Sequence, residues 1–407
     1  MASDSCPLPA SILVVAPQPF FQNRGTPIAV RLLVEELARL GYEVHLLVFH
    51  EGEEVALSGV RLHRIANIPG IKNIPPSLSS KKIICDIFML FKVFGLIRRH
   101  RFTLVHAVEE AAFMALAAKV VFATPYVYDM DSSLAQQIVE KFSFFKPLGP
   151  VLRFFEGLAI KGSCGVVAVC RALEEIALAY DRKKPVVRLE DISLLDDGAC
   201  AGEDLRQGHP CIGPLMLYVG NLEKYQGIDL LLQSFQLALN RGCRAQVVII
   251  GGTPESIAAY KKYAEELQVA EFTTFCGPRP VELLGHYLSQ ADILLSPRIQ
   301  GNNTPMKLYS YLDSGKPVLA TNLSTHTQVL TAEFACLVEP SKESMAAGMM
   351  ELVNDPEKRL RLGARGRSVA RENYSLKAYQ AKLSDFYRRI FAGLPGCCNP
   401  IQPKKNS

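Results

Sequence analysis

The sequence predicts a two-domain α/β protein in which each domain is built on a parallel β-sheet. Short runs that contain only apolar residues, such as Ile12–Ala16, are typical of strands buried on both faces of a parallel sheet. Segments with a helical spacing of apolar residues lie between these runs, so strands and helices alternate along the chain. A polar stretch with several Gly, Asp and Pro residues, 195–214, divides this series into two parts. We therefore expect two Rossmann-like domains.

The N-terminal half begins with one β-α-β unit. Ile12–Ala16 is its first strand, and a helix is expected over 27–40 with Thr26 as its N-cap residue. Val44–Phe49 is the second strand, and the crossover between parallel strands is right-handed as a rule. The other elements continue the alternation. Strands are expected at 60–65, 103–107, 126–128, 166–169 and 186–189, and helices at 81–101, 111–121 and 172–180.

The C-terminal half repeats this alternation after the linker 195–214. We expect the N-terminal domain over 1–194, the C-terminal domain over 215–375, and a disordered tail over 393–407. Open parallel sheets bind ligands at the carboxyl ends of their strands, so a cleft between the domains is the expected site. Strands are expected at 216–219, 246–250, 273–276, 293–296, 318–321 and 335–338, and helices at 229–240, 254–267, 280–289, 305–314, 341–354, 357–372 and 376–391.

Composition excludes several classes of protein. With 407 residues, of which 49% are hydrophobic and 21% charged, the chain is a folded protein rather than a disordered one. A formal net charge of +5 is too small to indicate a nucleic-acid partner. The 11 cysteines include no Cys-x-x-Cys pair, so neither a zinc ribbon nor a redox pair is indicated, and reduced thiols in a cytoplasmic protein are expected. We find no signal-peptide pattern, and the apolar stretch Ile83–Ile97 is too short to span a membrane.

The strongest local signal lies between Ala291 and Thr321. A buried strand there runs into a polar loop that contains Arg298, and a helix expected from Pro305 carries Lys307 in its first turn. Because a helix N-terminus offers free N–H groups and a partial positive charge, this arrangement is typical of a phosphate site. An ordinary loop with a solvated lysine is the alternative. The expected donor-binding residues of this loop and helix are Asn302, Asn303, Thr304 and Ser310.

Other loops that join a strand to a helix contain weaker signals. Glycines at such positions let a ligand approach the backbone closely, although each loop alone is equally explained as a structural turn. In the N-terminal half, His106 and Glu109 come at one strand end and Asp129 at another, where a histidine is commonly structural. The remaining candidates for donor binding are Arg24, Gly25, Gly220, Asn221, Lys224, Gly251 and Gly252.

Two segments of the N-terminal half, 81–101 and 141–161, mix Phe and Leu with Lys and Arg. Such a mixture is typical of a surface that rests on an anionic membrane. The alternative is that the apolar residues belong to the core while the basic side chains extend to solvent.

With these loops assigned, the sequence resembles the family 4 glycosyltransferases of the GT-B fold from Ile12 to about Phe391. The resemblance implies two Rossmann-like domains facing a cleft, with the helix 376–391 packing back on the N-terminal domain. It further implies transfer of a sugar from a nucleoside diphosphate sugar to an acceptor hydroxyl, with retention of configuration and without a cofactor or metal. The matching segments are Arg24-Gly25, 104–107, 218–222, 250–252, 275–277, Ala291-Asp292, Ser296-Pro297 and 315–318.

The chain departs from the family pattern at four positions. The family places two Glu residues where this chain has Asn302 and Ser310, the second of which holds the ribose. It also tends to have Arg and Lys, which bind the diphosphate, where this chain has Asn221 and Gln226. We expect other basic residues to neutralise the diphosphate instead, namely Arg298, Lys307 and Lys224. The expected catalytic residues are His106, Asp129, Arg298 and Lys307, with His106 in contact with the donor sugar or the acceptor.

If the segments 81–101 and 141–161 do form a membrane surface, the expected acceptor is a lipid-linked molecule or a nascent glycan, as in polysaccharide or glycolipid biosynthesis. The enzyme would then work in the cytoplasm, peripherally at the inner face of the membrane. Two other functions stay open at this point. One is a GT-B sugar-nucleotide epimerase, which would need no acceptor. The other is a non-catalytic sugar-nucleotide-binding or scaffold subunit, which the two missing Glu residues favour.

Overall fold

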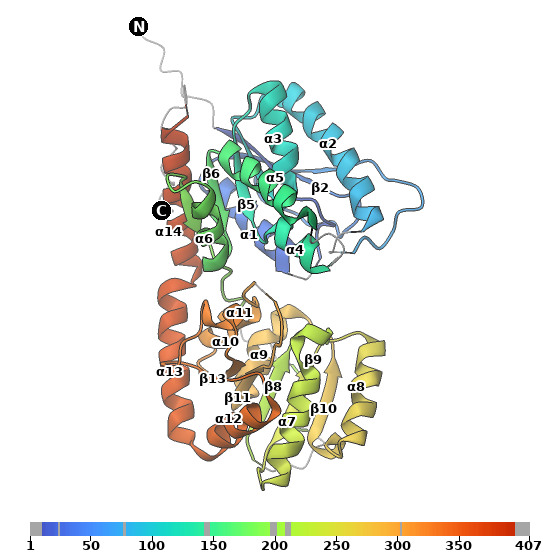
Figure 1. Cartoon of the computed structure of the whole chain (residues 1–407), viewed down its shortest axis with the longest axis vertical. Helices are drawn as coiled ribbons and strands as arrows, with labels where there is room; N and C mark the ends of the chain where they lie inside the picture. Colours follow the sequence, from blue (N-terminus) through green and yellow to red (C-terminus); the bar gives the residue numbers. More distant parts are fainter. Residues whose placement is uncertain are drawn as a thin grey trace. The chain divides into compact units, whose positions relative to one another are not determined.

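The computed structural model describes residues 10–22, 25–75, 79–141, 147–195, 202–207, 213–301 and 303–394. The chain divides into two compact units, each of which is described by itself (Figure 1). Unit 1 consists of Met1–Glu190 with Gln380–Ser407, and unit 2 consists of Asp191–Tyr379. The cleft expected between two domains stays a prediction.

Unit 1 contains a parallel sheet that has seven strands in the described residues, in the order β3-β2-β1-β4-β5-β6-β7. The direction in which successive strands are added reverses between β1 and β4, which makes their carboxyl ends the switch point of the sheet. The strands are β1 (Ser11–Val15), β2 (Glu43–Val48), β3 (Val60–Arg64), β4 (Leu104–Val108), β5 (Tyr126–Met130), β6 (Gly165–Ala168) and β7 (Val186–Arg188).

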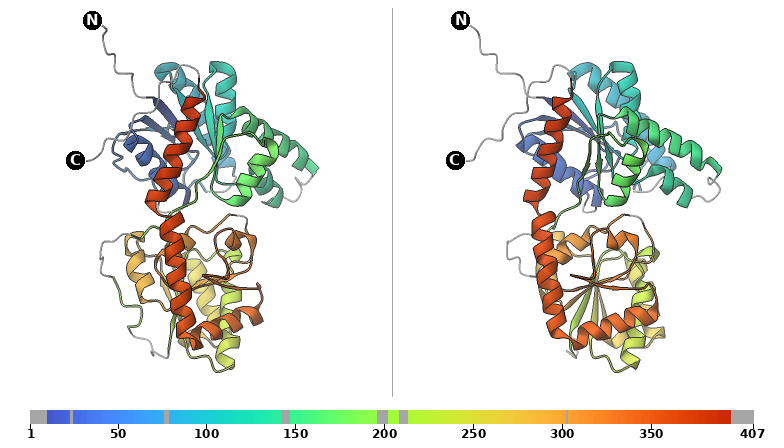
Figure 2. Two further views of the ribbon diagram at one scale, coloured as in Figure 1. Left: turned by 90° about the vertical axis from the view of Figure 1, so that its left-hand side faces the viewer. Right: turned by 60° about the vertical axis from the view of Figure 1, so that its left-hand side comes forward.

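Helices cover both faces of this sheet. On one face, α2, α3, α5 and α6 pack on a common apolar core. The other face is covered by α1 and α14, which are joined where Gln380 Nε2 donates to Glu36 Oε1 over 2.9 Å (Figure 2). The helices of unit 1 are α1 (Gly25–Arg39), α2 (Ser80–His100), α3 (Ala111–Phe122), α4 (Leu134–Lys141), α5 (Gly149–Gly162), α6 (Arg171–Tyr180) and most of α14 (Leu376–Ala392).

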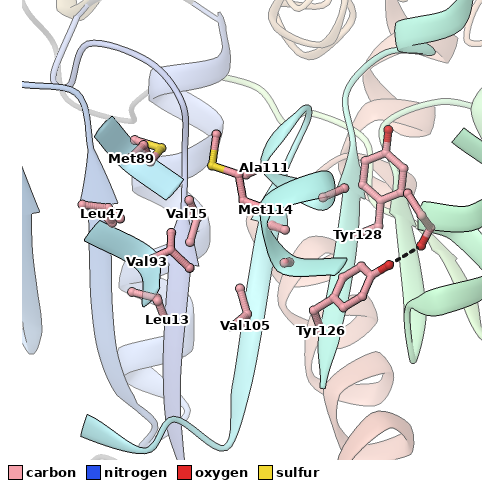
Figure 3. Packing of buried hydrophobic residues seen from close by; sticks show 14 of the residues in the cluster. Leu13, Val15, Leu47, Met89, Val93, Val105, Ala111, Met114, Tyr126 and Tyr128 are labelled. Carbon is pink, nitrogen blue, oxygen red and sulfur yellow. Dashed lines mark hydrogen bonds between the residues drawn. The ribbon is translucent and has the colours of Figure 1, made fainter. Parts of the chain in front are cut away.

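The apolar strands are explained by this burial on both faces. Alternate strand residues such as Leu13 and Val105 contribute to the cluster that contains Met89 and Met114 of the covering helices (Figure 3). Tyr126 keeps its hydroxyl satisfied inside this cluster by donating to the Ala159 carbonyl oxygen of α5 over 2.6 Å. A continuous apolar run is therefore what a strand in this sheet requires.

Unit 2 has a second parallel sheet, with six strands in the described residues in the order β10-β9-β8-β11-β12-β13. Its switch point lies between β8 and β11. The strands are β8 (Leu215–Val219), β9 (Gln246–Ile250), β10 (Thr273–Gly277), β11 (Ile293–Ser296), β12 (Val318–Thr321) and β13 (Cys336–Val338), and the helices are α7 (Ile228–Asn240), α8 (Pro254–Glu266), α9 (Leu284–Gln290), α10 (Lys307–Asp313), α11 (Ser324–Thr327), α12 (Lys342–Asn354) and α13 (Pro356–Asn373).

The two faces of this sheet also carry separate cores. Met216 and Tyr218 of β8 point into the cluster beneath α7 and α12. Leu215 and Leu217 of the same strand point into the cluster beneath α9 and α10. The fold class predicted from the sequence is confirmed, as is the packing of α14 on the N-terminal sheet.

Several local expectations were wrong. The structure has two helices, α4 and α5, where none was expected, and α1 begins at Gly25, so Thr26 lies inside the helix rather than at its N-cap. The helix expected from Pro305 begins only at Lys307, after a tighter turn in which Leu308 N–H donates to Pro305 O over 3.0 Å. The expected disordered tail lies outside the described residues except for 393 and 394. Within the described part of the chain, every helix is too short or too polar to cross a membrane.

Candidate functional site

The residues of the strongest sequence signal gather at the switch point of unit 2. The loop after β8 contains Gly220, and the loop after β11 contains Arg298 and leads into α10 with Lys307. Because β8 and β11 are neighbours in the sheet, their loops leave the same edge side by side. The carboxyl edge at a switch point is where open α/β sheets bind ligands.

Close backbone packing shapes this edge. Gly220 and Gly251 both have positive φ, at 152° and 113°, and a Cβ atom added to Gly251 would lie 2.1 Å from Gly220 O. The two loops therefore touch through their main chains, which only a glycine at position 251 allows. Gly252 follows with φ 90°. A Cβ atom on Gly252 would lie 2.6 Å from Leu222 Cδ1, so close packing requires this glycine as well. The approach of a ligand to the backbone here stays a prediction.

The guanidinium of Arg298 is fixed by its own loop and by α11. Its Nη1 donates to Asn303 O over 2.7 Å and to Thr325 Oγ1 over 2.9 Å. Its Cζ also lies over the ring of Tyr225, 5.0 Å from the centroid. Among the residues that the structure describes, no hydrogen-bond partner reaches its buried Nε. Arg298 is thus held in place while its Nε–H stays without a partner among those residues.

The ammonium group of Lys307 is buried in an unusual way. Nζ lies 3.8 Å from the centroid of the Tyr218 ring and is shielded from solvent, although the residue as a whole is only half-buried. No hydrogen bond reaches this Nζ from the part of the chain that is described. A Cβ atom on Gly220 would lie 3.4 Å from Nζ, which places the ammonium beside the glycine loop. A buried ammonium with three unused donors is costly without an anionic partner.

The pKa values of the basic groups at this edge also indicate that an anionic partner would be favourable. Burial, together with the charge of Arg298, holds the pKa of Lys307 well below its usual value. Burial also lowers the pKa of Arg298. The pKa of His326 falls to about 4, mainly through burial and further through the charges of Lys307 and Arg298. Among the described residues, no carboxylate offsets the charge of Arg298 or Lys307, so an anion at this edge would stabilise the charged forms of both.

Of the four donor-binding residues expected in this loop and helix, the structure describes three, Asn303, Thr304 and Ser310. The carbonyl oxygen of Asn303 accepts from Arg298, so that residue shapes the loop. Thr304 Oγ1 is buried and has no hydrogen-bond partner within the described residues. Ser310 is 1% exposed, and its Oγ accepts from the Leu194 backbone N–H over 2.9 Å. Asn302 lies outside the described residues, as does Arg24.

The helix N-terminus expected as an anion site is not present in that form. Helix α10 has only seven residues, and the N–H groups of Leu308 and Tyr309 already donate to Pro305 O and Met306 O. These two donors are therefore used within the preceding turn. Positive charge at this edge comes from the Arg298 and Lys307 side chains instead of from the end of the helix.

The loop after β8 provides less than expected. Lys224 is exposed in a short 3-10 turn, so its charge faces solvent. Asn221 is also exposed, and its Nδ2 donates weakly to Tyr225 Oη at 3.4 Å. Tyr225, which also underlies Arg298, thus links this loop to the one after β11.

His106 of unit 1 is not located at a strand end. It occupies the middle of β4, is 0% exposed, and faces α14. Its Nδ1 lies 2.7 Å from Tyr387 Oη and its Nε2 lies 2.9 Å from Asp129 Oδ2. Both ring nitrogens are therefore engaged by the protein, and the expected contact of His106 with a donor sugar or acceptor is not supported. The geometry instead makes His106 and Asp129 a polar link between the sheet and α14.

The switch point of unit 1 contains an acidic group. Glu109, directly after β4, has a positive φ of 51°, and Lys82 pairs with Glu110 at 2.5 Å. Burial and the charge of Glu110 raise the pKa of nearby Asp86 to about 8. Gly25 lies on the opposite side of the switch, exposed at the start of α1. Across the described residues, no group of three or more His, Cys, Asp or Glu side chains could hold a metal ion.

Comparison with known proteins defines the class to which this fold and site belong. Residues 24–189 match the model of the family described as "Glycosyl transferase 4-like domain", and residues 206–369 match "Glycosyl transferases group 1". Together these matches cover most of the chain. The chain belongs to the family 4-like glycosyltransferases of the GT-B fold.

Individual relatives are more distant. A D-inositol 3-phosphate glycosyltransferase of Corynebacterium aurimucosum is 27% identical over 198 residues, which are 47% of this chain and 47% of that protein. The matched stretch thus spans about half the length of this curated relative. A sucrose-phosphate synthase of Thermosynechococcus elongatus has a TM-score of 0.77 at 18% identity, with 95% of this chain and 100% of that one covered. HepE of Anabaena in complex with UDP has a TM-score of 0.69 at 14% identity, covering 93% and 99%.

Sequence reasoning missed the aromatic part of the site. Tyr218 receives the Lys307 ammonium, and Tyr225 receives the Arg298 guanidinium. Both tyrosines lie in the segment 218–227, where Gly220 had already indicated a candidate loop. The contacts of their rings with Lys307 and Arg298 depend on the pairing of β8 with β11, which the sequence does not show. His326 was missed as well. It is fully buried, and its Nε2 lies 2.9 Å from Ser296 Oγ.

Proposed function

We propose that this protein transfers a glycosyl group from a nucleoside diphosphate sugar to an acceptor hydroxyl. The observation that carries the proposal is the pair of basic side chains at the switch point of unit 2, Arg298 and Lys307. Both have a buried nitrogen without a hydrogen-bond partner among the described residues, and no carboxylate of those residues pairs with them. A diphosphate carries the negative charge that this pair lacks, and the Lys307 ammonium lies beside the glycine loop at the carboxyl edge of the sheet. Structures of HepE contain UDP or UDP-glucose, which supports a donor of this kind.

In the proposed reaction the bond between the anomeric carbon and the diphosphate oxygen breaks. A bond from the same carbon to the acceptor oxygen forms, and the hydroxyl proton passes to the departing diphosphate. Negative charge therefore grows on the diphosphate in the transition state. Arg298 and Lys307 would stabilise that charge more strongly in a buried site than in water, which lowers the barrier.

Retention of anomeric configuration is part of this proposal and rests on family membership alone. The acceptor is proposed to be a glycan or a lipid-linked hydroxyl. No metal is proposed, because the charge that a divalent cation would neutralise is assigned to the two side chains.

Calorimetry with a panel of nucleoside diphosphates tests the binding step, and a donor hydrolysis assay tests turnover. We expect micromolar to millimolar binding of at least one diphosphate, in the ordinary range for enzyme substrates. We also expect slow hydrolysis of the corresponding nucleoside diphosphate sugar, which releases free sugar. Absence of binding by every nucleoside diphosphate would contradict the proposal.

A second function is favoured by one specific observation. Ser310 stands where the family has the carboxylate that holds the ribose, and its hydroxyl is already used by Leu194 N–H. A protein that binds a sugar nucleotide without turnover would keep the cations but not this carboxylate. Tight diphosphate binding combined with no hydrolysis and no transfer to any acceptor would assign the chain to this non-catalytic class.

A further inference from the structure

Unit 1 exposes an extensive apolar surface on the helices that cover one face of its sheet. Helix α3 packs against both α2 and α5, so the three helices form one layer (Figure 1). Of the 14 large hydrophobic side chains that are exposed in the described residues, 12 belong to this layer, which we call the outer helix face. They are Ile83, Ile84, Ile87, Phe88 and Phe91 on α2, Val120 and Val121 on α3, and Leu148, Val151, Phe154, Phe155 and Leu158 at and along α5.

These residues form stripes along the helices. On α2 the exposed positions 83, 87 and 91 recur at every fourth residue, and on α5 the positions 151, 154, 155 and 158 have the same helical spacing. The opposite side of α2 is also apolar, since Met89 and Val93 are fully buried against the sheet. A helix on the surface of a soluble domain would present polar residues outward. The exposed apolar stripes therefore indicate a partner.

Charge on the outer helix face has one sign. The acidic residues of the three helices are not exposed. Glu156 is 2% exposed and accepts a hydrogen bond from Ser133 Oγ over 2.8 Å, and Asp86 is half-buried near the ion pair of Lys82 with Glu110. Every exposed charged side chain in α2, α3 and α5 is basic. These side chains are Lys92, Arg98, Arg99, Lys119, Arg153 and Lys161.

We propose that the outer helix face docks unit 1 on the surface of an anionic lipid bilayer. Phe91 and Phe154, exposed by 72% and 62%, would enter the boundary between headgroups and acyl chains, and the basic residues would pair with anionic headgroups. A second copy of the chain fits less well. In a two-fold symmetric interface this face would meet itself and bring like charges together.

The apolar stripes also lie near the edge that binds ligands. Both α2 and α5 lead into parallel strands, so each runs antiparallel to the sheet and begins near its carboxyl edge. The stripes occupy the first half of α2 and begin at the start of α5. A bilayer on this face would therefore lie beside the carboxyl edge of unit 1.

Flotation of the full chain with vesicles tests the docking. We expect it to float with phosphatidylcholine vesicles that contain phosphatidylglycerol, and to float several-fold less with pure phosphatidylcholine. Binding should fall in about 1 M salt, where the Debye length is about 3 Å.

The double variant Phe91→Glu/Phe154→Glu should lose at least about tenfold in vesicle affinity, since it removes two apolar anchors and adds two negative charges. Leu360→Glu is the matched control, because Leu360 is 75% exposed on α13 of unit 2, and it should bind as the parent does.

The variant Arg98→Gln/Arg99→Gln separates charge from apolar contact, and should lose the preference for phosphatidylglycerol. Failure of the parent chain to float with anionic vesicles would overturn the proposal, as would equal flotation of the Phe91→Glu/Phe154→Glu variant. A dimer in light scattering that this variant dissociates, without vesicle binding by the parent, would assign the face to a second copy instead. Circular dichroism and nucleoside diphosphate calorimetry on each variant check that it is folded. Vesicle binding requires no sugar transfer, so its outcome is independent of the proposed reaction.

Discussion

The ammonium nitrogen of Lys307 lies 3.8 Å from the centre of the Tyr218 ring. This contact joins the start of α10 to the carboxyl end of strand β8, at the switch point of the unit 2 sheet. The ring face offers the ammonium a partial negative charge but accepts no conventional hydrogen bond. A phosphate oxygen would be a stronger partner than the ring, and the first two predictions follow from this difference.

Replacing Lys307 with Ala should lower the turnover number by about 100-fold or more, which is the usual effect of removing one buried group that stabilises developing charge. The comparison is Lys342→Ala, because Lys342 is an exposed lysine of the same unit and should be dispensable. Steady-state kinetics with a radiolabelled donor measures both. Unchanged turnover in Lys307→Ala would remove this lysine from the mechanism.

Binding of a nucleoside diphosphate should take up protons. In the free protein the pKa of Lys307 lies well below its usual value, and a bound diphosphate would raise it. Between the free and bound pKa values the ligand favours the protonated form, so affinity should fall as pH rises through that window. Calorimetry with UDP in buffers of different ionisation enthalpy measures the uptake. Lys307→Ala should lose it, whereas an unchanged proton count in that variant would contradict the assignment.

The link from His106 to Tyr387 should stabilise unit 1. Tyr387→Phe leaves the buried Nδ1 of His106 without its partner at 2.7 Å, which should cost about 1 to 3 kcal/mol of unfolding free energy. Urea denaturation measures this cost. Because His106 is fully buried, diphosphate affinity of the folded variant should be unchanged. A large loss of affinity at unaltered stability would restore a direct substrate role to this part of unit 1.

Stability should decrease in mild acid because of a histidine cluster on β2 and β3. His63 Nε2 lies 3.0 Å from His45 Nδ1, and burial with the neighbouring charges lowers the pKa of His63 to about 4 and also lowers that of His45. The groups that face this pair are Glu43, Arg61, Lys92 and His100.

The sign follows from proton binding in the two states. Below the ordinary histidine pKa of about 6.5 the unfolded chain binds protons that the folded chain does not, so stability is present above that pH and is lost as pH falls towards about 4. Melting temperatures between pH 7 and pH 4 measure the effect. His63→Asn should reduce the slope, while His326, whose pKa is also lowered to about 4, should maintain part of it. A slope that His63→Asn leaves unchanged would contradict the role of the cluster.

Much of this architecture could be read from the sequence. Runs such as Ile12–Ala16 can be strands only if both faces are covered, and this requirement by itself predicts parallel sheets between helices. The glycines at 220, 251 and 252 and the basic residues at 298 and 307 likewise marked the loops that converge in unit 2. Local sequence patterns were enough for these predictions, because the hydrophobicity of a residue indicates its burial and a glycine indicates a backbone conformation or a close approach that other residues do not allow.

Other features depended on contacts between distant segments. His106 has the same neighbours in the sequence whether it faces a ligand or a helix, and only the packing of α14 places Tyr387 beside it. The stripes of α2 and α5 were equally consistent with core and surface, and their exposure followed from which side the sheet covers. The pairing of β8 with β11 placed Tyr218 beneath Lys307. The sequence by itself determined which segments become buried strands and helices, whereas tertiary structure alone decided the partners, because side chains far apart in the chain meet only after the sheets have formed.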